Sequence, residues 1–251
     1  MSFRSAKVIS VEELGENIYR MKLKLMDDLG INPLPFQFIM VWIPRVKEVP
    51  MSISDYVSGL LTILFRVRGR GTEALSKTTG FIGVRGPYGR GLNLRRGERV
   101  LVIAGGVGIA PIPYLVRTAL RTESSIGVLW GVRRASEVIS ENELFQGAKP
   151  SFFYVATEDC SSSYCGTAID VAPKAISQGN WDRVILIGPP EMLREGCSKL
   201  IEIDPLVVLE SIVKCGIGLC GTCSLKPLPT LLCVDGPLYR CSQVVDYLEH
   251  G

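Results

Sequence analysis

The stretch VIAGGVGIAPIP, residues 102–113, combines an apolar strand pattern, a glycine-rich turn and the start of a helix. Gly105, Gly106 and Gly108 let the backbone turn tightly and approach a ligand without a Cβ clash. Pro111 suits the first turn of a helix, because its φ is already helical and its missing N–H is not needed there. Free N–H groups at that helix start favour an anionic group such as a diphosphate. Read alone, the stretch is explained equally well by a tight turn without a ligand.

Strands and helices continue to alternate on the C-terminal side of this stretch. RVLVIAG, SIGVLWG, SFFYVAT and RVILIGP are near-continuous apolar runs, which is typical of strands buried on both faces of a parallel sheet. APIPYLVRTALRT, ASEVISENELFQ and AIDVAPKAIS lie between them and have the length of crossover helices. We therefore expect an α/β nucleotide-binding domain over residues 98–204.

Small or polar residues follow the ends of these predicted strands. They include Arg133, the TED tripeptide at 157–159, and Gly188, Pro189 and Met192 in LIGPPEM. Ligands of open α/β sheets bind beyond the carboxyl ends of the strands, where these residues would meet. Arg133 is then a candidate for contact with a phosphate.

Residues 1–97 predict a different architecture. NIYRMKLKL alternates apolar and polar residues, FQFIMVWIP is apolar and aromatic, and GLLTILFRVRG is β-branched and closed by glycine. Such short strands, with no long helical period between them, favour a small antiparallel β-barrel. Gly69, Gly71 and Thr72 lie in one of its turns and Gly86 in another. Singly each is a hairpin turn, and together they suit a phosphate-bearing cofactor.

Length and charge limit the classes of function. A chain of 251 residues suggests about two compact units. The 28 basic and 25 acidic residues leave a net charge of +3, which gives no basic field for nucleic acid. The amino terminus lacks a secretory pattern, so we expect a cytoplasmic protein, in which structural disulfides are uncommon. The longest apolar run, residues 100–116, is broken by glycine and proline and is too short to span a membrane.

Five of the eight cysteines lie in residues 205–251, a segment too short for its own hydrophobic core. In CGIGLCGTC, Cys215, Cys220 and Cys223 have the C-x4-C-x2-C spacing of plant-type [2Fe-2S] sites. The fourth ligand is either Cys233 or Cys241, and we favour Cys233. A structural zinc site is the main alternative, although only Cys220 and Cys223 form a C-x2-C pair. A C-x-x-C redox pair ranks lower, because the thioredoxin-like context is missing.

The remaining cysteines have no predicted role in a metal site. Cys160 and Cys165 also stand at C-x4-C spacing, but two thiols do not complete a cluster. We expect them to be incidental members of a polar loop, with a disulfide as the lesser alternative. Cys197 is expected to be a small buried apolar residue of a helix.

The order of these motifs resembles a known family. VPMS and GRGT in the barrel, GGVGIAP and GPPEM in the nucleotide domain, and CGIGLCGTC followed by LCVDGP are similar to the electron-transfer subunits of two-subunit, NAD-linked dihydroorotate dehydrogenases. These subunits belong to the ferredoxin-NADP reductase superfamily. The resemblance spans essentially the whole chain, and the cysteine pattern before Asp-Gly-Pro is its most specific part.

The resemblance implies an FAD in the barrel, a pyridine nucleotide, NAD or NADP, in the second domain and a [2Fe-2S] cluster in the third. Electrons would come from an FMN-containing subunit that oxidises dihydroorotate in pyrimidine biosynthesis, within a hetero-oligomer such as a heterotetramer. They would pass through the cluster and FAD to NAD.

The resemblance also implies roles for individual residues. Pro50, Met51 and Ser52 would border the flavin ring, with the Ser52 hydroxyl, the single catalytic candidate, hydrogen-bonded to it. The other implied positions are Gly69, Gly71 and Thr72 at the FAD phosphates, Gly106, Gly108, Pro111, Gly188, Pro189 and Met192 at the nucleotide, and Cys215, Cys220, Cys223 and Cys233 at the cluster.

Two positions depart from the family pattern. Val49 stands where an arginine usually precedes the flavin-motif proline, so Arg45, Arg66, Arg68 or Arg70 would have to replace it. Ile187 stands where a cysteine usually precedes Gly-Pro. Two other functions fit the motifs: a flavin and iron-sulfur subunit of another redox complex, of hydrogenase, sulfide-linked or transhydrogenase type, or a zinc-stabilised interaction module without catalysis.

Overall fold

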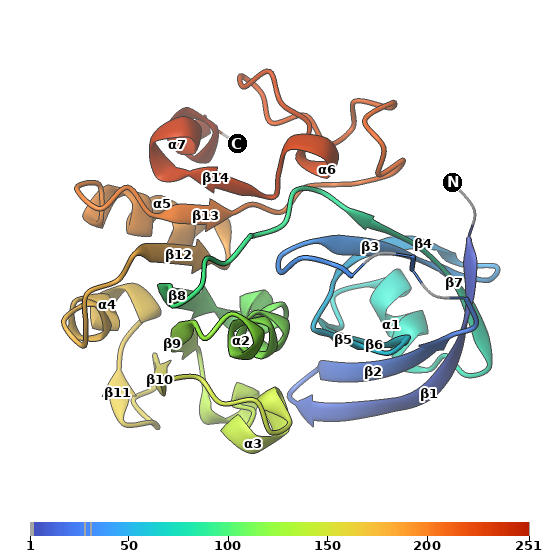
Figure 1. Ribbon diagram of the computed structural model, residues 1–251, viewed down its shortest axis with the longest axis horizontal. Coiled ribbons are helices and arrows are strands. Elements are labelled where there is room, and N and C mark those ends of the chain that lie inside the picture. Colours follow the sequence, from blue (N-terminus) through green and yellow to red (C-terminus); the bar gives the residue numbers. More distant parts are fainter. Residues whose placement is uncertain (1–2, 28, 31, 251) are drawn as a thin grey trace.

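In the computed structural model, which describes residues 3–27, 29, 30 and 32–250, two seven-stranded sheets lie side by side (Figure 1). The first sheet is antiparallel and has the order β4-β3-β7-β1-β2-β6-β5. Its strands are β1 (Arg4–Gly15), β2 (Ile18–Leu25), β3 (Phe38–Ile43), β4 (Lys47–Ser52), β5 (Asp55–Val57), β6 (Leu60–Arg66) and β7 (Phe81–Tyr88). This sheet curves into the barrel that the strand patterns predict.

The alternation in β2 shows why these residues form a barrel. Met21, Leu23 and Leu25 are buried in the barrel core, while Lys22 and Lys24 lie between them on the outer face. Apolar residues of β3, β6 and β7 fill the same core. One short helix, α1 (Arg70–Ser76), follows β6, and the strand patterns did not predict it.

The second sheet has the order β11-β10-β9-β8-β12-β13-β14, and every neighbouring pair is parallel except β13 with β14. Its strands are β8 (Arg99–Gly105), β9 (Ser125–Val132), β10 (Phe152–Thr157), β11 (Tyr164–Cys165), β12 (Arg183–Ile187), β13 (Leu206–Val208) and β14 (Leu238–Arg240). The four apolar runs correspond to β8, β9, β10 and β12, which confirms the predicted parallel sheet.

Helices cover both faces of this sheet. Residues of α2 (Ile112–Arg121) and α3 (Glu141–Phe145) pack on one face. Residues of α4 (Ala168–Ile176), α5 (Pro190–Lys199) and α7 (Cys241–His250) pack on the other. The second predicted crossover helix is shorter than expected, because Ser140 caps α3 by accepting a hydrogen bond from the Glu143 N–H, so that the helix begins only at Glu141.

The last segment, residues 205–251, is continuous with the second sheet rather than separate from it. It contributes β13 and β14 to that sheet, and its other elements are α6 (Leu232–Asp235) and α7. A disulfide between Cys197 of α5 and Cys241 of α7 joins it to the preceding domain. The last segment is too short to form its own hydrophobic core, and it therefore packs into the core of the second domain.

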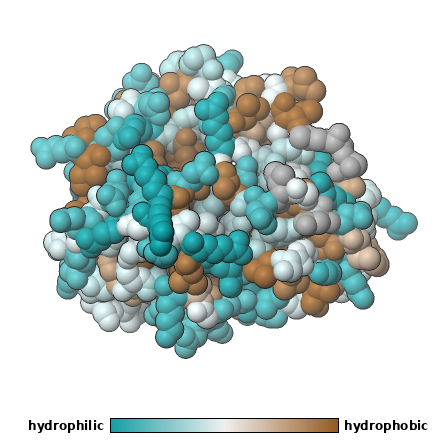
Figure 2. Space-filling view, viewed as in Figure 1, coloured by the Kyte–Doolittle hydropathy of each residue, from teal (hydrophilic) through white to brown (hydrophobic). Residues whose placement is uncertain are grey.

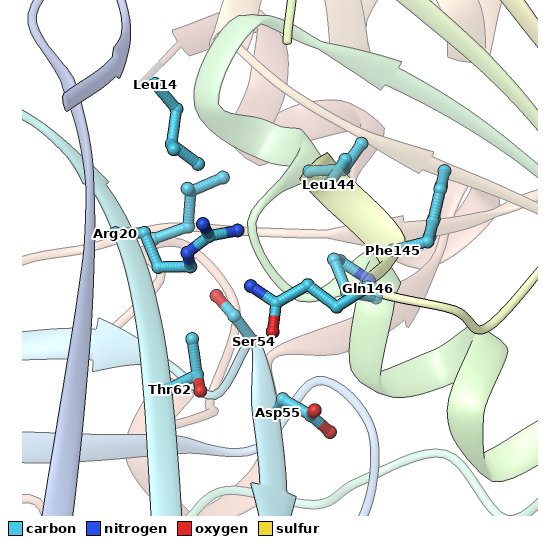
Figure 3. A pocket seen from close by; sticks show the side chains of 10 residues that line it. Leu14, Arg20, Ser54, Asp55, Thr62, Leu144, Phe145 and Gln146 are labelled. Atoms are coloured by element: carbon cyan, nitrogen blue, oxygen red, sulfur yellow. The ribbon is translucent and has the colours of Figure 1, made fainter. Parts of the chain in front are cut away.

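Polar contacts join helix α2 of the second domain to the barrel. Tyr114 of α2 donates its hydroxyl to the Pro33 carbonyl at 2.7 Å, and Arg117 is ion-paired with Asp55 at 2.7 Å. A cavity of about 20 Å³ lies at this interface. Figure 3 shows that Ser54 of the barrel faces Gln146 at the end of α3 in its wall. In the part of the chain that the structure describes, no helix is both long and apolar enough to span a membrane.

Candidate functional site

The carboxyl ends of β8, β9, β10 and β12 meet at one edge of the second sheet, where a cavity of about 570 Å³ opens. We call it the strand-end cavity. Gly106, Pro189 and Met192, all predicted as nucleotide-binding residues, line it together with Arg133. Glu158, from the TED tripeptide, lies in the same wall. The position of this cavity is the one at which α/β sheets bind their ligands.

The glycines of the β8–α2 turn also have a packing role. Gly108 lies so close to β12 that a Cβ on it would come within 2.7 Å of the Ile187 carbonyl oxygen. Gly106 has a φ of +52°. Between β8 and α2 the chain forms a short 3-10 turn, η1 (Gly106–Ile109), and Pro111 precedes α2 as expected. The turn therefore brings its backbone to the strand ends without side chains in between.

A second cavity, of about 290 Å³, lies between the barrel, the η1–α2 turn and the last segment. We call it the central cavity. Its walls include six predicted positions, namely Pro50, Met51, Ser52, Thr72, Gly108 and Pro111. Phe36, Phe38 and Leu64 add apolar surface, and Glu210 adds a carboxyl group.

The predicted glycines of the barrel lie outside the walls of these two cavities. A Cβ on Gly71 would come within 2.9 Å of Val49 Cγ1, and one on Gly86 within 3.2 Å of the Phe38 carbonyl oxygen. Close packing thus explains both. The Thr72 hydroxyl accepts hydrogen bonds from the N–H groups of Arg68 and Gly69 at 2.9 and 3.2 Å, so it shapes the start of α1. Gly188 lines a smaller neighbouring cavity with Gly108.

Two arginines line the cavities although position 49, where the family usually has an arginine, is a valine. Val49 is buried in the barrel core. Of the four arginines considered as its replacement, Arg66 and Arg68 line both cavities, whereas Arg45 and Arg70 line neither. Arg66 is ion-paired with Glu137, yet its Nε is buried without a hydrogen-bond partner among the described residues. An unsatisfied buried donor beside a cavity fits a site for an anionic group.

Four cysteines of the last segment carry free thiols: Cys215, Cys220, Cys223 and Cys233. They form two pairs, because the Cys220 N–H faces Cys215 Sγ at 3.5 Å and the Cys233 N–H faces Cys223 Sγ at 3.5 Å. Within the described ranges, no three Cys, His, Asp or Glu side chains converge on a single ion position. Two pairs suit a cluster of two irons, whereas a structural zinc ion draws four ligands to one point.

The two pairs differ in their electrostatics. The N–H groups of Ile217 and Cys220 lower the pKa of Cys215 to about 6, and Thr222 lowers the pKa of Cys220. Burial, and then the neighbouring Cys223, raises the pKa of Cys233 to about 12. Metal binding must therefore displace the proton of the Cys233 thiol, whereas the lowered pKa values of Cys215 and Cys220 make their thiolates easier to form. Gly216, Gly218 and Gly221, at φ of +75°, +80° and +69°, permit the loop that presents these N–H groups.

Arg85 of β7 fixes this loop to the barrel. Its guanidinium donates to the carbonyl of Lys214 at 2.8 Å, to the carbonyl of Cys215, and to Glu48 at 2.7 Å. The Gly89 N–H donates to the Cys233 carbonyl at 3.1 Å. We call residues 214–236 the thiol loop. Sequence reasoning missed Arg85, because its contacts lie about 130 residues away along the chain.

The other four cysteines correct two predictions. Cys197 is not an isolated apolar residue, because it is bonded to Cys241. Cys160 and Cys165 are not incidental, because they also form a disulfide. Two disulfides are therefore present where structural disulfides were expected to be uncommon, and for Cys160 and Cys165 the lesser alternative is the one observed. Since Cys241 is already bonded, Cys233 is the one free thiol beyond CGIGLCGTC.

Comparisons with known proteins agree with this geometry. The family model for the iron-sulfur cluster binding domain of dihydroorotate dehydrogenase B matches residues 210–245. The probable dihydroorotate dehydrogenase B (NAD(+)) electron transfer subunit of Archaeoglobus fulgidus is 31% identical, covering 95% of this chain and 97% of its own. The corresponding subunit of Caldanaerobacter subterraneus is also 31% identical and covers 96% and 97%.

Solved structures show the same fold. A chain from the structure of an NADH-dependent reduced ferredoxin-NADP oxidoreductase superposes with a TM-score of 0.82 at 22% identity, covering 95% of this chain and 88% of that one. The ferredoxin reductase of carbazole 1,9a-dioxygenase gives 0.68 at 20% identity, with 81% and 66% covered. The predicted ferredoxin-reductase-like fold is confirmed. By its full-length similarity to the relatives above, the chain belongs to the family of electron transfer subunits of NAD-dependent dihydroorotate dehydrogenase B.

Proposed function

We propose that this protein transfers electrons from an FMN-containing dihydroorotate dehydrogenase subunit to NAD, through a [2Fe-2S] cluster held by the thiol loop and an FAD held in the central cavity. The observation that carries the proposal is the continuity of the three sites. Leu232, directly before Cys233, and Pro237, four residues after it, line the central cavity, and Gly108 and Arg68 join that cavity to the strand ends. Neighbouring sites of this kind suit electron transfer between bound groups.

The central cavity fits a flavin in its chemistry. Phe36, Phe38 and Leu64 offer apolar walls for a flat ring, and Ser52 at the end of β4 offers a hydroxyl. The Arg66 guanidinium, with its unsatisfied Nε, and Arg68 would bind the diphosphate, together with Thr72 near the start of α1. Gly69 and Gly71 lie outside the walls of this cavity and would act only by shaping the start of α1. When bound, FAD supplies hydride transfer and the cluster supplies single-electron transfer.

The strand-end cavity would bind the pyridine nucleotide. Gly106 and Gly108 let the η1 backbone approach a diphosphate, and Arg133 offers a cation at the end of β9. Gly188, Pro189 and Met192 would hold the nicotinamide side, next to the central cavity. Glu158, directly after β10, offers a carboxylate that would accept hydrogen bonds from ribose hydroxyls.

A catalytic partner subunit would dock over the thiol loop. Ile217 is 41% exposed and Leu219 80% exposed within it, and Ile212, just before it, is 71% exposed. Figure 2 shows hydrophobic side chains gathered at the upper right of the visible face, where Figure 1 places the orange part of the chain. Apolar side chains around exposed ligands are expected where electrons must cross between two proteins, because a desolvated contact shortens the distance.

The test is anaerobic isolation of the native complex, with measurement of iron, FAD and FMN and of dihydroorotate-dependent NAD reduction. We expect about two irons and one FAD per chain, and a co-purifying FMN protein. A colourless, zinc-containing protein would contradict the proposal. Iron and FAD with a partner that does not oxidise dihydroorotate would instead identify a subunit of another redox complex.

A further inference from the structure

The two disulfides of this chain differ in their access to solvent. Cys197 and Cys241 are 3% and 0% exposed between α5 and α7. Cys160 and Cys165 are both exposed; Cys160 lies in the loop after β10, and Cys165 ends the short strand β11, which pairs with β10. An external thiol must reach a disulfide sulfur to open it. Only the Cys160–Cys165 bond meets that requirement.

The loop closed by this disulfide, residues 160–165, folds back on Thr157. The Thr157 carbonyl accepts hydrogen bonds from the N–H groups of Cys160 and Gly166, at 3.1 and 3.0 Å. Its hydroxyl is fully buried and accepts from the Ser162 N–H at 3.0 Å. The hydrogen bonds and the disulfide therefore hold the same turn, and breaking the disulfide leaves it closed by hydrogen bonds alone.

Residues on both sides of the disulfide line the strand-end cavity. Glu158 precedes Cys160 by two positions, Thr167 follows Cys165 by two, and both side chains lie in the cavity wall. The Asp159 N–H also donates to the carbonyl of Arg133, another wall residue, at 3.2 Å. The disulfide thus lies at the rim of the cavity and covalently fixes the spacing of two of its wall residues.

We propose that the Cys160–Cys165 disulfide is a thiol-disulfide exchange site for an external dithiol, and that its reduction weakens binding of the pyridine nucleotide in the strand-end cavity. The second part rests on the proposed function, which places the nucleotide there. In the exchange, one dithiol gives two electrons and two protons. The S–S bond between Cys160 and Cys165 breaks, each sulfur becomes a thiol, and the reductant leaves as its own disulfide.

The weaker binding follows from conformational entropy. With the Cys160–Cys165 disulfide intact, the backbone on both sides of residues 160–165 is restricted before NAD binds. After reduction, binding must also order the segment that carries Glu158 and Thr167. The hydrogen bonds to Thr157 remain, so we expect a moderate change, about a 3- to 10-fold higher Kd for NAD.

The experiment uses the holoprotein with dithiothreitol as the probe. Differential alkylation and mass spectrometry at increasing dithiothreitol should label Cys160 and Cys165 well before Cys197 and Cys241. In parallel, NAD binding is measured by calorimetry before and after reduction. The Cys160→Ser/Cys165→Ser variant should show the weaker Kd without reductant and no further response to it. Ser163→Ala, an exposed change in the same loop, should respond as the wild type does.

The outcomes separate this inference from the proposed function. Equal Kd values for NAD in the oxidised and reduced forms would overturn this inference alone. Labelling of the buried pair first, or of all four cysteines together, would overturn the assignment of the exchange site, whatever binds in the cavity. If the oxidised holoprotein bound no NAD, both this inference and the proposed function would fail.

Discussion

Cys233 lies beside Cys223 in the interior, 2% exposed, whereas Cys241 is bonded to Cys197 between α7 and α5. The cysteine spacing alone left both residues as candidates for the fourth ligand, since either follows CGIGLCGTC at a permissible distance. The sequence does not show that Cys197 is the disulfide partner of Cys241, because the two residues are brought together only by the packing of α5 against α7.

We predict that Cys233→Ser abolishes the visible absorbance of the cluster and lowers its iron content, because a hydroxyl is a poor, weakly acidic ligand for iron in place of a thiolate. Cys241→Ser removes a cysteine of the same segment but leaves all four free thiols, so its iron content should match that of the wild type. Absorption spectra and iron analysis of both purified variants test this. The reverse pattern would transfer the ligand role to Cys241.

The role of Arg85 could not be predicted from the sequence. Its position in VRGPYG indicates only a turn, and its partners Glu48 and Cys215 are remote in sequence. The spacing of cysteines within a short loop can be recognised in a sequence, because the length of the loop alone limits where their thiols can lie. A contact between β7 and the thiol loop depends on the assembled fold, and therefore carries no local pattern.

We predict that Arg85→Met lowers the free energy of unfolding by about 2–4 kcal/mol, because it leaves the Glu48 carboxylate and two thiol-loop carbonyls without their donor. The side chains of Arg85 and Glu48 are only 12% and 22% exposed. The matched control is Arg96→Met. The side chains of Arg96 and its ion-pair partner Glu123 are 80% and 67% exposed, so this pair should contribute less than about 1 kcal/mol to the free energy of unfolding. Urea denaturation of both variants measures these changes. Equal losses of unfolding free energy in the two variants would contradict the role of Arg85 in fixing the thiol loop to the barrel.

At the scale of elements, α2 performs two tasks. Its N-terminal end follows the η1 turn at the cavities, and one of its side chains, Tyr114, is buried in the barrel core. The apolar pattern of APIPYLVRTALRT was enough to predict the helix but not that Tyr114 faces the other domain, because periodicity identifies a buried face without identifying what covers it. The short helix α1 was missed for a related reason, since seven residues carry almost no period.

Tyr114 also makes the stability of this contact depend on pH. Burial raises its pKa to about 12, above the value near 10 of an unfolded tyrosine. The contact is intact below pH 10, and stability falls as pH rises from about 10 toward 12, because only the unfolded chain ionises readily there. The full loss is about 2–3 kcal/mol at 1.36 kcal/mol per pKa unit.

Tyr114→Phe should be less stable than the wild type at pH 8, by about 1 kcal/mol, because the Pro33 carbonyl loses its donor. Its stability should then decline less steeply above pH 10. Denaturation curves at pH 8, 9.5 and 11 measure both effects. Parallel pH profiles for the two proteins would show that Tyr114 ionises as freely in the folded state as in the unfolded one.

At the scale of the whole molecule, composition and strand patterns were sufficient for two architectures, an antiparallel barrel and a parallel sheet. They did not predict that residues 205–251 add β13 and β14 to the second sheet. LVV, residues 206–208, is too short to be recognised as a strand, and it becomes one because β12 offers it a parallel edge. The cluster segment therefore inherits the stability of the nucleotide domain through β13, β14 and the Cys197–Cys241 disulfide.

That dependence predicts an order of stabilities. The Cys197–Cys241 bond closes a loop with a sequence separation of 44, and chain entropy then assigns it about 4 kcal/mol as an upper value. The Cys160–Cys165 bond has a separation of 5 and is assigned about 2 kcal/mol. We predict that Cys197→Ala/Cys241→Ala lowers the melting temperature more than Cys160→Ala/Cys165→Ala, and that it releases α7, detected as faster amide exchange over residues 241–250. If the exposed pair stabilised the protein more, the last segment would be held by its strands rather than by its disulfide.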